Sequence, residues 1–251
     1  MEHQELVKRY LCGAGVEIGA FKTPIPGIKP VYVDRFSSYA GEPTLADYYG
    51  DACELPFFDS SVPFVAASHV LEHVANPLLA LSEWFRVTRH GGIIYLVVPD
   101  RRLTFDRARP LTDPDHMIED YRNRVTQSDA THIDDFAYGV DWAIFSPSTP
   151  KGRELEARRE LAETYHASVR AGLEINIHFH TFERASLLGL ISVGNRTGVW
   201  DGRIDVLQVA EEFPDSNPIG ILVVARVRKP IGARLRALVS RKGLRDDARK
   251  P

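Results

Sequence analysis

Cysteine is scarce in this sequence. Among the 251 residues there are two cysteines, Cys12 and Cys53, and neither belongs to a CxxC pair. Two isolated thiols cannot form a disulfide framework, which excludes the class of small secreted domains held together by disulfides. We therefore expect both cysteines to be reduced and to pack as ordinary small side chains.

Long hydrophobic runs and an excess of positive charge are also missing. No segment approaches the ~20 consecutive apolar residues that a membrane-spanning helix needs. The N-terminal residues show no apolar run behind a basic stretch, so we expect a cytoplasmic protein without a transmembrane segment. The formal net charge is −3. Domains that bind nucleic acid are usually basic, so we expect no nucleic-acid partner.

The hydrophobic content bounds the number of domains. Hydrophobic residues make up 44% of the chain, enough for the core of one elaborated domain. We expect a single domain over residues 1–228, with an inserted segment at about 101–172. A basic tail over residues 229–251 is predicted to form either a solvated terminal helix or an amphipathic helix that contacts an anionic surface.

Short apolar runs alternate with helix-like segments through the first hundred residues, as is typical of βαβ units in a parallel sheet. The predicted strands, including two late ones, are Val16–Gly19, Val31–Arg35, Tyr48–Ala52, Phe64–Ser68, Ile93–Pro99, Ile204–Val209 and Ile219–Val227.

Helix signals lie between and after these strands. Asn76 and Pro77 predict the start of a helix, because asparagine is a good N-cap and proline suits the first turn. His90-Gly91-Gly92 is predicted to stop this helix and turn the chain into the next strand. Further helices are predicted around Arg153–Arg170 and at Thr181–Ser192.

Three strand ends carry residues suited to an adenosine-type ligand. Gly19 follows the first strand, where a glycine lets a ligand approach the backbone closely. Asp34 ends the second strand, where a carboxylate can accept both ribose hydroxyls. Asp51 ends the third strand and is placed to accept the exocyclic amine of adenine. Together these positions predict a pocket at the carboxyl ends of the strands.

Further motifs follow in order along the chain. They are Asp51-Ala52-Cys53-Glu54-Leu55-Pro56-Phe57, Val70-Leu71-Glu72-His73-Val74, Pro77 and Gly91-Gly92. Over about residues 12–100 the chain resembles the class I S-adenosylmethionine (SAM)-dependent methyltransferases, in particular the branch with the pattern DAxxLPF, VLEHV, P and GG.

The resemblance implies a doubly wound, Rossmann-like α/β fold with a seven-stranded, mostly parallel sheet and a reversed final hairpin. It also implies SAM as cofactor. It places Glu17 and Gly19 near the methionine portion, Asp34 at the ribose, Asp51 and Ala52 at the adenine, and His69 on the lining. The neighbouring Ala20 and Arg35 complete the predicted cofactor-binding set.

One position departs from the family pattern. The family usually has GxGxG after the acidic residue, whereas Phe21, Lys22 and two prolines occupy the later part here. We therefore expect a bulkier first loop with a shortened or displaced helix. A dinucleotide oxidoreductase is disfavoured because GxGxxG is absent. A non-catalytic nucleotide-binding module remains an alternative.

Histidines in and after the insertion are the candidates for catalysis. An acceptor hydroxyl needs a base as it attacks the methyl group, and histidine is the commonest general base. We predict His132, His178 or His180 for this role. His178 and His180 are alternate residues, so an extended segment would turn both imidazoles toward the same space. The insertion is predicted to be a mobile, acceptor-binding lid with few residues in a continuous core.

A divalent metal such as Mg²⁺ is an alternative to an unaided base. Imidazoles together with Asp134, Asp135 or Glu72 could hold such an ion and lower the pKa of a diol. Aromatic residues interspersed with polar ones suit a sugar, although they could equally form the insertion's own core. These aromatics are Tyr121, Phe136, Tyr138, Trp142 and Phe145.

The insertion also looks like that of bacterial methyltransferases associated with sugar and polysaccharide pathways. The predicted function is therefore SAM-dependent O-methylation of a sugar or polysaccharide-precursor hydroxyl. N- or O-methylation of another small metabolite is the competing enzyme function.

Overall fold

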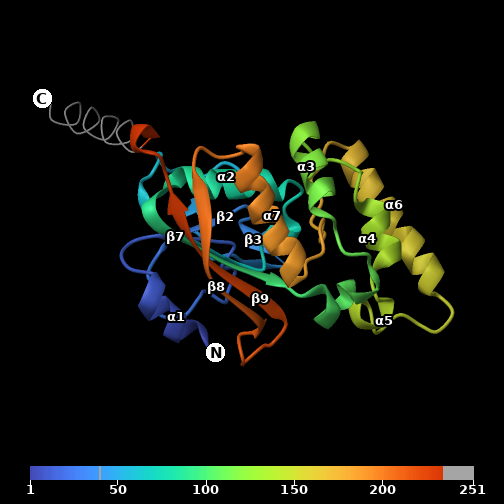
Figure 1. Ribbon diagram of the computed structural model, residues 1–251. Helices are drawn as coiled ribbons and strands as arrows, with labels where there is room; N and C mark the ends of the chain where they lie inside the picture. Colours follow the sequence, from blue (N-terminus) through green and yellow to red (C-terminus); the bar gives the residue numbers. More distant parts are fainter. Residues whose placement is uncertain (40, 234–251) are drawn as a thin grey trace, which may run out of the picture.

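A seven-stranded sheet forms the centre of the computed structural model, which describes residues 1–39 and 41–233 (Figure 1). The strand order is β5-β2-β1-β6-β7-β9-β8. The first five of these are parallel, whereas β9 runs antiparallel to both β7 and β8. The bounds are β1 Val16–Ile18, β2 Val31–Asp34, β5 Tyr48–Tyr49, β6 Val62–Ser68, β7 Thr88–Pro99, β8 Arg203–Phe213 and β9 Gly220–Arg228. The predicted fold class, with its reversed final hairpin, is confirmed.

Helices cover both faces of this sheet. The helices α2 (Pro77–Val87) and α7 (Arg184–Thr197) bury apolar side chains on one face, and Trp84 is completely buried there. The helix α1 (His3–Tyr10) packs Leu6 and Val7 on the other face, against Phe64 and Tyr95. Successive side chains of a strand point alternately into these two cores. Because both cores exclude water, the strands are almost continuously apolar.

The connection from β1 to β2 contains turns and no helix. Gly19 has φ of 65° and Phe21 has φ of 47°, so the chain bends sharply as it leaves β1. The sequence predicts a shortened or displaced first helix, whereas the structure has no helix at all in this connection. The small hairpin of β3 (Ser38–Tyr39) and β4 (Glu42–Pro43) follows β2.

Two predicted boundaries were wrong. The helix α2 already ends at Val87, and His90-Gly91-Gly92 lies within β7, where the register against β6 shifts between Val62 and Phe64. The glycines thus form a bulge rather than a turn. The helix α7 starts at Arg184, three residues later than predicted, because Glu183 and Ser186 form a capping box.

The insertion folds around a core of its own, so the expectation of few core residues was wrong. It comprises α3 (Pro114–Asn123), α4 (Ile133–Gly139), α5 (Trp142–Phe145) and α6 (Glu154–Arg170), preceded by the 3₁₀ turns η2 (Arg101–Leu103) and η3 (Phe105–Ala108). Apolar residues of α4, α5 and α6 bury one another, and Phe136 and Trp142 belong to this cluster. Met117 of α3 instead packs into the core between the sheet, α2 and α7. Figure 1 shows the insertion beside α7, to one side of the sheet. Of the predicted aromatic residues, Phe136, Trp142 and Phe145 pack in the insertion's cluster, Tyr121 packs against the sheet-face core, and Tyr138 is exposed.

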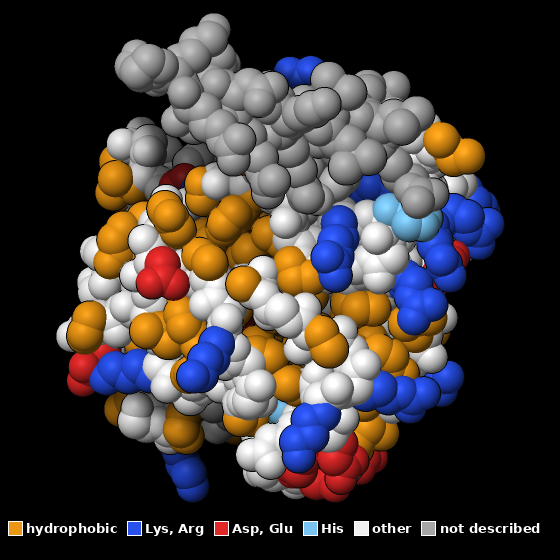
Figure 2. Space-filling view, turned by 90° about the vertical axis from the view of Figure 1, so that its left-hand side faces the viewer, with side chains coloured by type: hydrophobic (Ala, Val, Ile, Leu, Met, Phe, Trp, Pro, Cys, Tyr) orange, Lys and Arg blue, Asp and Glu red, His pale blue; other side chains and the backbone are white. Residues whose placement is uncertain are grey.

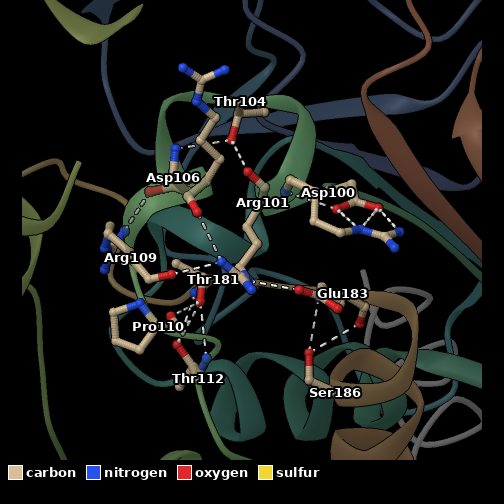
Figure 3. Close-up of polar contacts among 12 residues, drawn as sticks. Asp100, Arg101, Thr104, Asp106, Arg109, Pro110, Thr112, Thr181, Glu183 and Ser186 are labelled. Carbon is tan, nitrogen blue, oxygen red and sulfur yellow. Dashed lines mark hydrogen bonds and ion pairs between the residues drawn. The ribbon is translucent and has the colours of Figure 1, made fainter. Parts of the chain in front are cut away.

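Polar contacts join the start of the insertion to its end (Figure 3). The Arg101 guanidinium donates to Glu183 at 2.7 Å and to the carbonyl of Arg109 at 2.8 Å. The Thr181 hydroxyl donates to the carbonyl of Pro110 at 2.8 Å. The insertion therefore leaves and rejoins the sheet at one fixed point.

The surface carries charges of both signs. Figure 2 shows Lys and Arg side chains around the right-hand side and lower edge of one face, with hydrophobic and acidic side chains between them. Within residues 1–39 and 41–233, no helix combines the length and the apolar character that crossing a membrane requires. Most of the predicted basic tail, residues 234–251, lies outside the described residues. Lys229, its first residue, is buried and donates to Ser60 at 2.8 Å.

Candidate functional site

A cavity of about 270 Å³ opens at the carboxyl ends of β1, β2 and β6. The strand order reverses between β1 and β6, and ligands of open α/β sheets bind at such a switch point. Six of the eight predicted cofactor-binding residues line the cavity. They are Gly19, Asp34, Arg35, Asp51, Ala52 and His69.

Asp34 is the last residue of β2 and Asp51 follows the neighbouring strand β5, and both residues line this cavity. Asp34 is almost fully buried, and burial raises its pKa although the Phe36 N–H donates to it at 3.0 Å. Asp51 accepts from the N–H of Cys53 at 2.7 Å and pairs with Arg35. Both carboxylates therefore lie on the lining of the cavity, as the sequence predicts.

Glu17 and Ala20 do not line the cavity. Glu17 is buried beneath the loop after β1, where one carboxyl oxygen accepts from the N–H of Ile25 at 2.8 Å. The other oxygen has no hydrogen-bond partner in the described part of the chain. Burial raises the pKa of Glu17 to about 7, and the bond from Ile25 offsets this only in part.

The insertion supplies one wall of the cavity. Gln127, Ile175 and Asn176 line it, and the N–H of Ile175 donates to the carbonyl of Gln127 at 2.9 Å. Arg35 donates through Nε to Glu174 at 2.7 Å, and its other side pairs with Asp51. An ion-pair bridge of Asp51, Arg35 and Glu174 thereby connects the sheet to the end of the insertion.

Imidazoles surround a buried carboxylate beside the cavity. His69 and His73 line the cavity, and Glu72 lies between them with 1% of its surface exposed. Nδ1 of His69 is 3.5 Å from the Glu72 carboxylate. Burial opposes protonation of His69, but Glu72 outweighs this and raises the pKa of the imidazole. Burial also opposes ionisation of Glu72, yet the nearby imidazoles keep its pKa low.

The three histidines predicted as catalytic do not line the cavity. His178 is the nearest: its ring packs against His73 at 4.6 Å between centroids, and its Nδ1 lies 2.5 Å from Asp106. His132 and His180 are buried in a separate group around Asp120.

The expectation that His178 and His180 share one space was therefore wrong. The segment from 173 to 181 contains bends and no strand, so alternate residues need not point the same way. The predicted partners Asp134 and Asp135 also lie elsewhere. Asp134 pairs with His166 at 3.0 Å, and Asp135 pairs with Arg109 at 2.6 Å.

Several residues of this region were not found from the sequence. Asp106, Asp120 and Glu174 gave no signal of their own, because each meets its histidine or arginine partner only through the fold of the insertion. The proximity of Glu72 to His69 could have been found, because an i, i+3 spacing after a strand suits a helical turn. In the structure Glu72 lies in the 3₁₀ turn η1 (Leu71–His73), and His69 lies just before this turn with φ of 56°.

Part of the chain is similar to known methyltransferase sequences. Residues 28–96 match a family model described as a methyltransferase domain. A probable S-adenosylmethionine-dependent methyltransferase of Mycolicibacterium smegmatis is 41% identical over 61 residues, 24% of this chain and 23% of that protein. An uncharacterized 37.1 kDa protein in transposon TN4556 of Streptomyces fradiae is 31% identical over 98 residues, 36% of this chain and 28% of that protein. The matched region thus spans less than a third of either relative.

Two of the solved structures that match this chain are described as follows. A SAM-dependent methyltransferase from Methanosarcina mazei has a TM-score of 0.47 at 17% identity. The match covers 92% of this chain and 100% of that chain. A possible histamine N-methyltransferase from Thermotoga maritima has a TM-score of 0.46 at 16% identity, covering 90% and 88% of the two chains. Residues 28–96 of this chain are thus similar to a methyltransferase domain, and the seven-stranded sheet has the topology expected from the sequence.

Proposed function

We propose that this protein transfers the methyl group of SAM to a hydroxyl group of a small polar molecule, in the class of sugars and related polyols. The observation that carries the proposal is the cavity at the switch point of the sheet. Carboxylates of Asp34 and Asp51 lie on its lining, together with an imidazole backed by a buried carboxylate, His69 and Glu72.

The residues around the cavity fit the cofactor. Asp34 would hold the ribose hydroxyls and Asp51 the adenine amine, while Gly19 lets the ligand approach the end of β1. When bound, SAM supplies a methyl group on a positively charged sulfur. The chain's own task is then to align the acceptor with that carbon and to exclude water.

His69 is the proposed general base. Its Nδ1 faces Glu72, which leaves Nε2 free to take the proton of the acceptor hydroxyl as the new oxygen–methyl bond forms. The carbon–sulfur bond breaks at the same time, and the product is the demethylated cofactor. Glu72 stabilises the imidazolium that results, because an opposite charge favours the protonated ring.

The acceptor class follows from the wall that the insertion contributes. Gln127 and Asn176 offer amide donors and acceptors for several hydroxyls, and the ring of Tyr39 lies on the lining for an apolar sugar face. A neutral amine is already nucleophilic and would not need the His69–Glu72 pair. This favours O-methylation over N-methylation.

A divalent ion is the alternative means of activating the hydroxyl. Glu72, His73 and His178 offer ligand atoms that all lie within 4.8 Å of one another, beside the cavity. An ion there would lower the pKa of the hydroxyl directly. In that case His69 would be dispensable, and the three ligands would not.

The test is formation of the demethylated cofactor from labelled SAM with a panel of free sugars, sugar nucleotides and small amines. We expect turnover with a hydroxyl acceptor. With that acceptor, His69→Asn should lower turnover by about 10²–10⁴, a much larger factor than its effect on SAM affinity. Turnover with amines alone would contradict the proposal. Loss of turnover on replacing Glu72, His73 or His178, with His69→Asn active, would favour the metal.

A further inference from the structure

Four side chains from three parts of the insertion region converge on one point away from the cavity. His116 and Asp120 lie one turn apart on α3, His132 precedes α4, and His180 lies shortly before α7. Asp120, His132 and His180 have 5%, 4% and 0% of their side chains exposed, whereas His116 has 46%. Three of the four side chains are thus buried, and solvent reaches the group at His116.

The ligand-type atoms of these side chains form a compact set. One carboxylate oxygen of Asp120 lies 2.9 Å from Nε2 of His180, 3.4 Å from Nε2 of His132 and 3.5 Å from Nε2 of His116. The Nε2 atoms of His116 and His132 are 3.1 Å apart. With zinc–ligand bonds of 2.0–2.1 Å, neighbouring ligand atoms of a tetrahedral site lie about 3.3 Å apart. The four measured separations scatter around that value.

Hydrogen bonds alone do not account well for this packing. The Nε2 atom of a neutral imidazole either donates or accepts, but Nε2 of His132 lies close to both the Asp120 carboxylate and Nε2 of His116. Nδ1 of His132 is already 2.8 Å from the hydroxyl of Thr131. A cation bound by all three Nε2 atoms and the Asp120 carboxylate removes this conflict at Nε2 of His132, and Thr131 then holds the His132 ring by its Nδ1.

We propose that His116, Asp120, His132 and His180 bind one Zn²⁺ ion in a structural site. Three imidazoles and one carboxylate suit zinc, whereas magnesium and calcium prefer oxygen ligands. Four protein ligands complete a tetrahedron and leave no open position for a substrate, which is the mark of a structural site.

The site would fasten the insertion to the sheet. Its ligands join α3 and the start of α4 to the segment that leads into α7, and α7 packs on the sheet. None of the four residues lines the cavity. The site is also separate from the group of Glu72, His73 and His178, so its existence does not depend on the proposed methyl transfer.

Metal binding by the full chain, without an affinity tag, tests the site. Zinc affinity is measured by competition with a chromophoric chelator, and the coordination is examined by the absorption spectrum of the cobalt-substituted protein. We expect one tightly held ion per chain and a tetrahedral cobalt spectrum. His116→Ala should weaken zinc binding by at least about 100-fold, because even residues behind a ligand cost 10–100-fold. His116 is partly exposed, so this variant should still fold.

Matched variants distinguish zinc binding at this site from zinc binding elsewhere on the chain. His166→Ala removes an imidazole of the same insertion that pairs with Asp134 instead, and it should bind zinc as the parent does. Asp120→Asn keeps the shape of the buried ligand and should lose zinc like His116→Ala. Zinc should raise the melting temperature of the parent and of His166→Ala but not of the two ligand variants.

Three results would overturn the proposal. The first is a parent protein that takes up no zinc. The second is unchanged zinc affinity in both His116→Ala and Asp120→Asn. The third is zinc that is lost in Glu72→Gln and kept in Asp120→Asn, which would place the ion beside the cavity.

Discussion

At the scale of single residues, buried carboxylates distinguish this site from an ordinary sheet edge. Burying a carboxylate without partners is costly, because the charged form loses its hydration. Glu72 is stabilised by the imidazoles around it, whereas Glu17 has one backbone donor, Ile25. The two side chains therefore differ in charge state near neutral pH.

The raised pKa of Glu17 predicts a pH-dependent effect on stability. Its carboxyl titrates at about 7 in the folded chain, above the ordinary value of 4.5. The unfolded chain therefore loses this proton first, and the free energy of unfolding falls as pH rises from about 4.5 through 7. Glu17→Gln should remove that loss and stabilise the protein by up to about 3 kcal/mol above the folded pKa.

Denaturant unfolding at two pH values measures this effect. The gain from Glu17→Gln should be present at about pH 8 and nearly absent at about pH 4.5. Asp59→Asn, which changes an exposed carboxylate, is the control and should behave as the parent does. An equal effect of Glu17→Gln at both pH values would mean that Glu17 is ionised in the folded protein throughout.

At the scale of elements, the Arg35 bridge between Asp51 and Glu174 links the insertion to the cofactor side of the cavity. All three side chains are partly exposed, so the bridge should contribute little to global stability. Its position predicts an effect on ligand exchange instead. Glu174→Gln should speed release of bound SAM by several-fold while changing the melting temperature little.

Stopped-flow displacement of the cofactor measures this release rate. Glu163→Gln, a change to an exposed carboxylate of α6 that does not line the cavity, is the matched control. A release rate in Glu174→Gln equal to that of the control would show that the bridge does not restrict the cavity.

The elements of the sheet were predictable from the sequence, whereas the insertion was not. Strands such as β6 and β9 carry apolar side chains on both faces, and this pattern is visible in a single sequence. The insertion offers no such period, because its core forms between short helices and irregular segments. Its burial of Phe136 and Trp142 depends on contacts distant along the chain.

The same distinction applies to the site. Gly19, Asp34 and Asp51 follow predictable strand ends, so the sheet topology alone brings them to one cavity. His178 and His180 could not be placed, because their segment has no regular secondary structure. Neighbours in sequence therefore joined different groups, one with Asp106 and one with Asp120.

At the scale of the whole molecule, the chain combines a seven-stranded, mostly parallel sheet with a helical insertion that has a separate core. The two parts meet at the cavity, to which the insertion contributes Gln127, Ile175 and Asn176. Because the insertion has its own core and a fixed polar attachment, we expect it to move as one body. Amides of α4 and α6 should exchange slowly even without ligand, and the segment at 173–176 should gain protection when cofactor and acceptor bind.

Hydrogen exchange followed by mass spectrometry tests this division. Fast exchange throughout residues 101–172 in the free protein would contradict a folded insertion core. Protection at 173–176 that does not change with ligand would contradict its place in the wall of the acceptor site.

We propose that SAM binds in the cavity at the switch point and that the Asp34 carboxylate accepts hydrogen bonds from its ribose hydroxyls. Calorimetric titration of SAM into the parent and into Asp34→Ala tests it most directly, with Asp59→Ala as the control. Losing this buried partner should cost about 1.5–3 kcal/mol, or roughly ten- to a hundredfold in affinity. We expect that loss in Asp34→Ala and parent-like SAM affinity in Asp59→Ala. A parent protein that does not bind SAM, or equal affinity in Asp34→Ala, would contradict it.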